Sequence, residues 1–193
     1  DSRLGHSFLF AGAGYGGSCF PKDVRAMVST GKEYGIDLKV LASANEVNDE
    51  QKKFISSKVR EYFGSDIKQK KIAVWGLSFK PKTDDIREAP ALVIIEELLK
   101  EGAKITAYDP EAMENTKKIL KDRISFSSNN YDALKGADAL VLATEWSVFR
   151  RPDFEKMKKL MNQPVIFDGR NIYSPSDMKD KGFKYFFIGR PAV

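Results

Sequence analysis

The sequence predicts an α/β protein in which a helical segment with one long helix precedes a Rossmann-like, doubly wound parallel sheet. Over residues 21–63, apolar side chains recur every three or four positions, which is the period of a helix packed on one side. From residue 71 onward, short apolar runs alternate with amphipathic stretches of about ten residues, the pattern of repeated strand–helix–strand units. Together these two patterns predict the fold class.

The composition of the chain indicates which classes of binding partner to expect. The chain has 193 residues, 42% of them hydrophobic, enough for one large core or two small ones. The net charge of +5 comes from 32 basic and 27 acidic side chains that are interspersed along the chain, so we predict no nucleic-acid partner and favour a small anionic ligand. One cysteine forms no intrachain disulfide, and no apolar run approaches the ~18 residues of a membrane span, so we expect a cytoplasmic protein without a membrane partner.

The helical segment contains two expected helices. The first covers 21–34, beginning with a proline that suits a first helical turn and ending at Gly35. The second covers 38–63, roughly seven turns, a length typical of a bundle or a dimer interface. The polar connector after Gly64 marks a domain boundary, which divides the chain into residues 1–66 and 67–193. The chain begins with Asp1 in a charged, mid-protein type of sequence, so we expect a fragment whose N-terminal part is missing.

The second segment should contain five strands and three helices. The expected strands are 72–77, 104–108, 139–144, 164–167 and 184–188, and the expected helices are 91–99, 111–121 and 152–161. In such a sheet the ligand site lies at the carboxyl ends of the strands.

The stretch AGAGYGGSCFPKD, residues 11–23, is the first candidate site. It contains a G-x-G-x-x-G pattern, but neither a buried strand before it nor an acid about 20 residues later completes a dinucleotide fingerprint. We interpret the glycines as allowing close backbone approach to a ligand. Cys19 stands where the following helix begins, with Asp23 one turn further on, and a helix N-terminus favours the thiolate. A nucleophile and a buried structural thiol both remain open for Cys19.

The stretch GLSFKPKTDDIRE, residues 76–88, is the second candidate. It occupies the first strand-to-helix turn, where phosphates usually bind, and carries Lys80, Lys82 and Arg87 in place of a glycine cluster. The alternative is a solvated loop in which Thr83 or Asp84 caps the next helix.

Three further residues are considered as possible ligand-binding or metal-binding residues. Asp109 stands where a Rossmann domain places its ribose acid, but a turn residue before Pro110 fits equally. Arg170 follows an expected strand on the ligand side and suits bidentate anion binding, and the alternative is a surface-loop arginine. His6 has no acidic or cysteine partner at ligand spacing, so we assign it no metal.

Five motifs stand in one characteristic order: GYGGSCFPKD, GLSFKPKTDDIRE, YDP, ATEW and FDGRN. With them the chain closely resembles, over essentially its whole length, the C-terminal half of members of the UDP-glucose/GDP-mannose dehydrogenase family. The resemblance implies a two-step, NAD-dependent oxidation of a sugar C6 alcohol to a carboxylate. Cys19 would form a thiohemiacetal and then a thioester, and Asp23 would help activate water. The resemblance favours UDP-glucose over GDP-mannose, and a non-catalytic nucleotide-binding or dimerisation module remains an alternative.

The resemblance also implies binding roles. It assigns the substrate, UDP-glucose or its product, to Arg3 reaching into a partner subunit and to Phe8, Phe10, Ala11, Gly12, Ala13, Gly14, Tyr15, Gly16, Phe79, Lys80 and Arg170. It assigns NAD contacts to Cys19, Lys22 and Arg87, with the main NAD-binding domain preceding this chain, so the fragment alone should be inactive. The long helix would form a homodimer. Several members have lysine where Phe10 stands, so Phe10 does not supply that charge.

Overall fold

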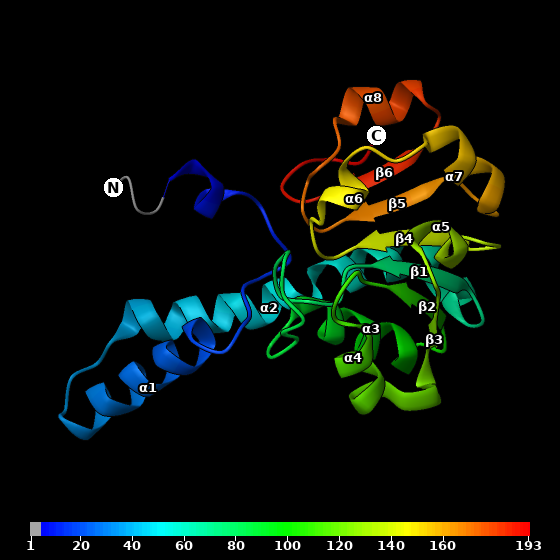
Figure 1. The fold of residues 1–193 in the computed structure, drawn as a ribbon. Helices are drawn as coiled ribbons and strands as arrows, with labels where there is room; N and C mark the ends of the chain where they lie inside the picture. Colours follow the sequence, from blue (N-terminus) through cyan, green and yellow to red (C-terminus); the bar gives the residue numbers. More distant parts are fainter. Residues whose placement is uncertain (1–4) are drawn as a thin grey trace.

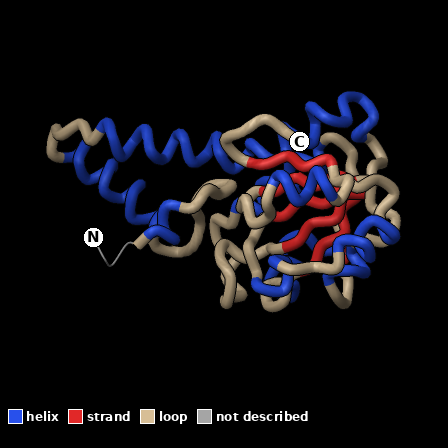
Figure 2. The backbone as a smooth tube through the Cα atoms, turned by 90° about the horizontal axis from the view of Figure 1, so that it is seen from above, coloured by secondary structure: helices blue, strands red, loops and turns tan. Residues whose placement is uncertain are grey.

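A helical arm projects from a body built on one sheet (Figures 1 and 2). The computed structural model describes residues 5–193. After a short 3-10 helix, η1 (His6–Leu9), the arm consists of α1 (Phe20–Glu33) and α2 (Lys39–Phe63), which pack as a hairpin. Both predicted helices are confirmed, with bounds within one residue of those expected. No helix of the described residues is both long and apolar enough to cross a membrane.

The body contains a six-stranded sheet in the order β3-β2-β1-β4-β5-β6, and every pairing in it is parallel. The strands are β1 (Lys71–Trp75), β2 (Lys104–Tyr108), β3 (Ser125–Phe126), β4 (Ala139–Leu142), β5 (Val165–Asp168) and β6 (Lys184–Phe187). The predicted doubly wound sheet is confirmed. The strand order reverses between β1 and β4, which is where such sheets form a ligand crevice. The sequence pattern missed β3 because two residues show no periodicity.

Six helices of the described residues connect or flank the strands. They are α3 (Pro90–Lys100), α4 (Met113–Leu120), α5 (Asn130–Ala133), α6 (Ser147–Arg150), α7 (Phe154–Leu160) and α8 (Pro175–Asp180), with 3-10 turns η2 (Gly64–Ile67) and η3 (Lys121–Arg123). The predicted helices 91–99, 111–121 and 152–161 correspond to α3, α4 and α7. The α5, α6 and α8 helices were not predicted, since four to six residues are too few to show a helical period.

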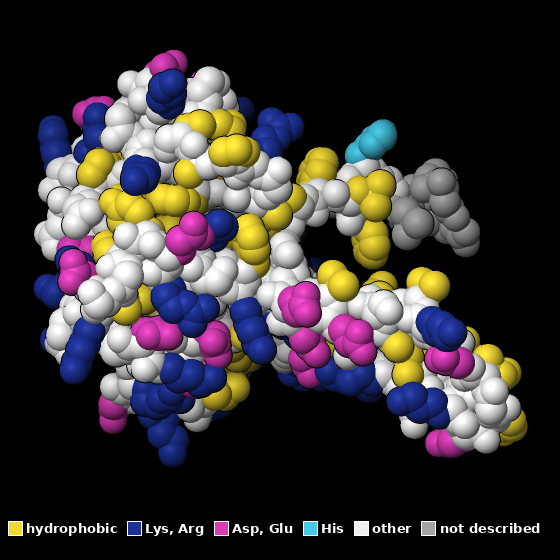
Figure 3. Space-filling view, turned by 180° about the vertical axis from the view of Figure 1, so that it is seen from behind, with side chains coloured by type: hydrophobic (Ala, Val, Ile, Leu, Met, Phe, Trp, Pro, Cys, Tyr) yellow, Lys and Arg dark blue, Asp and Glu magenta, His cyan; other side chains and the backbone are white. Residues whose placement is uncertain are grey.

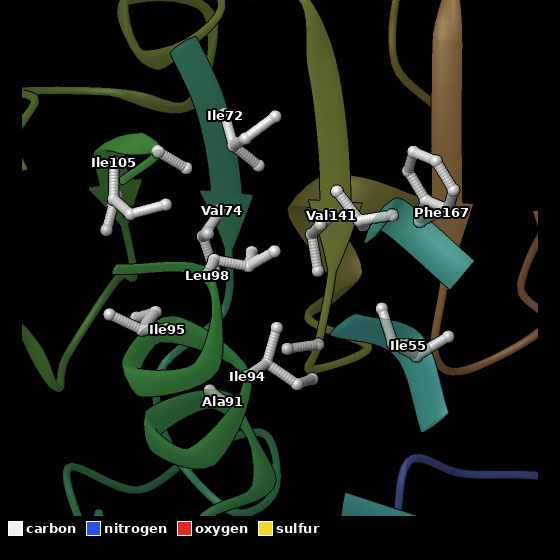
Figure 4. Close-up of a cluster of buried hydrophobic side chains, with 14 of the residues drawn as sticks. Ile55, Ile72, Val74, Ala91, Ile94, Ile95, Leu98, Ile105, Val141 and Phe167 are labelled. Atoms are coloured by element: carbon white, nitrogen blue, oxygen red, sulfur yellow. The ribbon is translucent and has the colours of Figure 1, made fainter. Parts of the chain in front are cut away.

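Both faces of the sheet are buried. Alternate residues of β1 face opposite sides: Ile72 and Val74 join one core, and Ala73 and Trp75 join the other. The first core includes Ile55 of α2, which lies near α3 and the strands (Figure 4). The carboxyl half of α2 therefore covers the sheet while its amino half extends into the arm, so the arm and the body share one continuous helix.

Candidate functional site

The glycine-rich stretch crosses the carboxyl edge of the sheet. At one end, Ala13 is buried against Gly169, which follows β5; a Cβ on Gly169 would lie 3.2 Å from the Ala13 Cβ. At the other end, the Gly17 N–H donates to the Arg87 carbonyl, 2.8 Å away, in the loop between β1 and α3. The stretch thus spans the crevice where the strand order reverses, which is the place predicted for a ligand.

Polar side chains of α2 hold this stretch in place. Asn48, only 4% exposed, accepts from the Tyr15 N–H at 2.7 Å and donates to the Tyr15 carbonyl at 3.2 Å. Gln51 donates to the Gly12 carbonyl at 2.8 Å. Neither Asn48 nor Gln51 was predicted from the sequence. Their only signal is that polar groups interrupt the inward side of an otherwise apolar helix, where they need hydrogen-bond partners.

Cys19 caps the start of α1. The Asp23 N–H donates to its carbonyl at 2.8 Å, and the thiol is free and exposed. The buried-thiol alternative is therefore wrong, and the predicted position at a helix N-terminus is confirmed. Asp23 lies in the first turn, where its carboxylate accepts from the Lys22 ammonium at 2.6 Å. This hydrogen bond raises the pKa of Lys22.

The loop of residues 76–88 meets the glycines through an aromatic ring. Phe79 packs so closely on Gly17 that a Cβ there would lie 2.8 Å from the ring. The Lys80 ammonium is 5.2 Å from the centre of the same ring, and the residue is exposed. Arg87 donates to both carboxylate oxygens of Asp85, at 2.9 and 2.7 Å, which raises the pKa of Arg87 and lowers that of Asp85.

The capping alternative for this loop is wrong. Because α3 begins at Pro90 and its N-cap is Ala89, neither Thr83 nor Asp84 reaches the helix start. Thr83 instead accepts from the Asp85 N–H at 3.2 Å, which tightens the turn within the loop.

Asp109 is buried, and its carboxylate stabilises the turns that follow β1 and β2. One carboxylate oxygen accepts from the N–H groups of Leu77 and Ser78, at 2.7 and 3.2 Å, and from the Trp146 indole at 3.0 Å. The other accepts from two N–H groups that follow Pro110, at 2.9 and 2.8 Å, which delays the start of α4. The turn interpretation is confirmed. Since Asp109 occupies the loop amides that a dinucleotide would need, this sheet does not fit NAD bound in the Rossmann manner.

A pocket of 370 Å³ opens beside the glycine stretch. Its lining contains two arginines, one glutamate, one asparagine amide and three apolar side chains. These residues are Phe10, Ala11, Glu145, Arg150, Arg170, Asn171 and Ile172. Arg170 donates to Glu145 at 2.8 Å, and its Nε lies 2.6 Å from the second Glu145 oxygen. The surface-loop alternative for Arg170 is wrong, because its side chain is 21% exposed and faces this pocket.

The buried carboxylate of Asp168 fixes the backbone at Arg170. Asp168, at the end of β5, accepts from the N–H groups of Arg170 and Ile172, at 2.7 and 2.8 Å, and from the Tyr185 hydroxyl at 2.7 Å. Burial raises the pKa of Asp168. On the other side, Gly12 packs directly against the Arg170 guanidinium, where any Cβ would overlap it. The arginine is therefore held between the end of β5 and the glycine stretch.

The structure brings most of the predicted residues to one edge. Phe10, Ala11, Gly12 and Arg170 meet at the pocket, whereas Phe79 and Lys80 lie on the neighbouring β1 loop and do not line it. Phe8 is 60% exposed, with its ring 6.3 Å from that of Phe20. The prediction for Arg3 lies outside the described residues. Glu145 and Arg150 were not predicted as site residues; Glu145 stands in the ATEW motif, its only signal.

Two family models match this chain. The UDP-binding domain of the UDP-glucose/GDP-mannose dehydrogenase family matches residues 73–175, and the central domain of the same family matches residues 1–50. Among curated relatives, a UDP-glucose 6-dehydrogenase of Pseudomonas aeruginosa is 44% identical over 99% of this chain, and UDP-glucose 6-dehydrogenase TuaD of Bacillus subtilis is 42% identical over 100%. The chain spans 43% and 42% of their respective lengths.

Solved structures of other proteins have the same fold as this chain. A UDP-glucose dehydrogenase from the archaeon Pyrobaculum islandicum superposes with a TM-score of 0.82 at 28% identity, covering 96% of this chain and 40% of that one. A GDP-mannose dehydrogenase from Pseudomonas aeruginosa, at 23% identity and a TM-score of 0.75 over 96% of this chain and 42% of that one, shares the fold. With more than half of its residues matched by one family model, this chain belongs to the UDP-glucose/GDP-mannose dehydrogenase family.

Proposed function

We propose that this chain is the cysteine-bearing, nucleotide-sugar-binding part of an NAD-dependent UDP-glucose 6-dehydrogenase that makes UDP-glucuronate. One observation carries the proposal: a single glycine-rich stretch runs from the Arg170 pocket to the exposed thiol of Cys19. A ligand lying along that stretch would have an anion-binding end and a nucleophile end. This is the arrangement that a charged nucleotide joined to a reactive sugar requires.

Cations suited to a diphosphate gather along this edge. Arg150 and Arg170 line the pocket, and Lys80 stands exposed on the adjacent loop. Arg170 offers a planar fork of donors, which matches phosphate oxygens better than a point charge does. By resemblance, Phe79, Lys80 and Arg170 would hold the UDP part, and the backbone of residues 10–15 would lie along the sugar nucleotide.

Cys19 would supply covalent catalysis. Its sulfur would add to the C6 aldehyde formed in the first oxidation, and the proton would pass to the aldehyde oxygen to give a thiohemiacetal. Loss of hydride from C6 and of the hydroxyl proton would leave a thioester, which water, activated with help from Asp23, would hydrolyse to the carboxylate and the free thiol. Two molecules of NAD⁺ would each accept one hydride, and they would be bound mainly by residues outside this chain. We therefore expect this chain alone to be inactive.

Calorimetric titration of this chain with UDP, UDP-glucose and GDP-mannose tests the proposal. We expect the two uridine ligands to bind and to slow alkylation of Cys19, and GDP-mannose to bind more weakly. Lys80→Ala should weaken UDP binding by about tenfold, the effect of losing one charge-assisted contact. Binding of GDP-mannose alone would select that substrate instead. Absence of nucleotide binding, together with unchanged alkylation, would contradict the proposal.

An exposed apolar surface on the arm supports the proposal of a homodimer. Large apolar side chains are exposed along α1, α2 and their connection: Met27 is 55% exposed, Val40 82% and Val47 61%. Figure 3 shows hydrophobic side chains along this arm. Several large apolar groups exposed on a projecting hairpin are typical of a subunit interface. We propose that two copies pair through their arms.

Val40→Asp should convert the dimer into a monomer, because it would bury an unpaired carboxylate in the interface. Sedimentation velocity at micromolar concentration measures the change. Ile119→Asp is the matched control, since Ile119 is 56% exposed on α4 in the body and should leave the association state unchanged. A wild-type chain that sediments as a monomer would refute the arm interface for this chain.

A further inference from the structure

One carboxylate joins the two halves of the candidate site. Glu88, at the end of the β1–α3 loop, accepts from Arg25 of α1 at 2.7 Å and from Lys52 of α2 at 3.0 Å. Both hydrogen bonds lower the pKa of Glu88. The Lys52 side chain is only 4% exposed, and a Cβ on Gly14 would lie 3.0 Å from its Cγ. This ion-pair cluster therefore lies directly under the glycine stretch.

The backbone of the same loop touches the residues just before the thiol. Gly16 packs on the Glu88 carbonyl so closely that any Cβ would overlap it. The Gly17 N–H donates to the Arg87 carbonyl at 2.8 Å. The path from Glu88 to Cys19 thus consists of close backbone contacts followed by two residues of chain.

Glu88 holds an unfavourable backbone conformation. Its φ is +53°, in the left-handed region that glycine tolerates and side-chain-bearing residues adopt at a cost. Such a conformation persists only where the surroundings enforce it. The start of α3 does not require a glutamate here, because the N-cap is Ala89. A glycine at position 88 would adopt this φ without strain, but it would lack the bonds to Arg25 and Lys52.

We propose that Glu88 is a positioning residue for Cys19. By tying the loop that carries Phe79 and Lys80 to both helices of the arm, it holds the glycine stretch and the thiol at its end in one arrangement. A nucleotide bound to this loop would then alter the reactivity of Cys19 through Glu88. That last step rests on the proposed function, whereas the positioning itself rests only on the contacts above.

Cys19 is the only cysteine of the chain, so alkylation reports on this residue alone. We expect Glu88→Gln to change the alkylation rate of Cys19 by about tenfold, the size of effect found within one hydrogen-bond network, and to speed amide exchange over residues 14–19. Glu96→Gln is the matched control: Glu96 bonds Arg123 twice at 2.6 Å and is similarly exposed, at 36% against 38% for Glu88. It should leave both measurements as in the wild type.

A second variant distinguishes a folding defect from a loss of positioning. Glu88→Gln leaves the buried Lys52 ammonium without this carboxylate, which by itself destabilises a protein. The double variant Lys52→Met/Glu88→Gln removes both charges and should keep the wild-type unfolding midpoint. It should still show the altered alkylation and exchange. A folded double variant with wild-type alkylation and exchange would overturn the proposal.

UDP provides the third measurement. Glu88→Gln should bind UDP with an affinity within about twofold of the wild type, since Lys80 and Arg170 are untouched, but UDP should no longer alter Cys19 alkylation. A variant that keeps the full UDP effect would contradict the coupling. If UDP fails to bind the wild type, the proposed function fails, and the alkylation and exchange measurements without ligand still decide whether Glu88 positions the thiol.

Discussion

Replacing Asp109 with alanine should lower the free energy of unfolding by about 3–5 kcal/mol, the cost of leaving several buried donors without their acceptor. The carboxylate is fully buried and accepts from four backbone N–H groups, the Ser78 hydroxyl and the Trp146 indole. These donors come from the three segments that follow β1, β2 and β4. We expect the thermal midpoint to fall by ~10 °C, the usual scale for a chain of this length.

Two variants test the reason for this loss. Asp109→Asn keeps the shape but turns an NH₂ donor toward N–H donors, so it should destabilise nearly as much as alanine does. Asp122→Ala, in the exposed turn η3, should stay within about 0.5 kcal/mol of the wild type. Urea unfolding followed by circular dichroism measures all three. An alanine variant as stable as the wild type would show that the turn holds without this carboxylate.

Arg170→Ala should weaken UDP binding by about 100-fold, or ~2.7 kcal/mol, because a charge-assisted donor pair is lost. The substitution also leaves the Glu145 carboxylate in the pocket without the arginine that now pairs with it. That remaining carboxylate would repel a diphosphate, which makes the loss larger than for an isolated exposed cation.

The neighbouring variants separate charge from geometry. Arg170→Lys keeps the charge without the fork and should fall between wild type and alanine. Glu145→Gln frees Arg170 from its partner and should leave UDP binding unchanged or tighter. Arg123→Ala, which breaks the pair with Glu96 of α3 and does not touch the pocket lining, should have no effect on UDP binding. Calorimetry gives all the affinities, and an Arg170→Ala variant that binds UDP normally would remove this pocket from the proposed site.

Regular elements were predictable because their patterns are local. The period of apolar residues located α1 and α2 to within one residue, and strand–helix alternation predicted every strand except β3. The elements missed, such as α5 and α6, have four residues each and are decided by how the chain passes between strands. The start of α4 was placed two residues early because the hydrogen bonds of Asp109 to the following turn cannot be recognised from periodicity.

The sequence by itself determined that Cys19 begins a helix, since Pro21 suits a first turn and glycines precede it, and that Arg170 follows a strand on the ligand side. Only the tertiary structure decided which groups these residues meet. Asn48 bonds Tyr15 across 33 positions, Lys52 bonds Glu88 across 36, and Arg170 bonds Glu145 across 25. Such partners are brought together by the order of strands in the sheet and by the path of α2 over it, and no local pattern encodes that order.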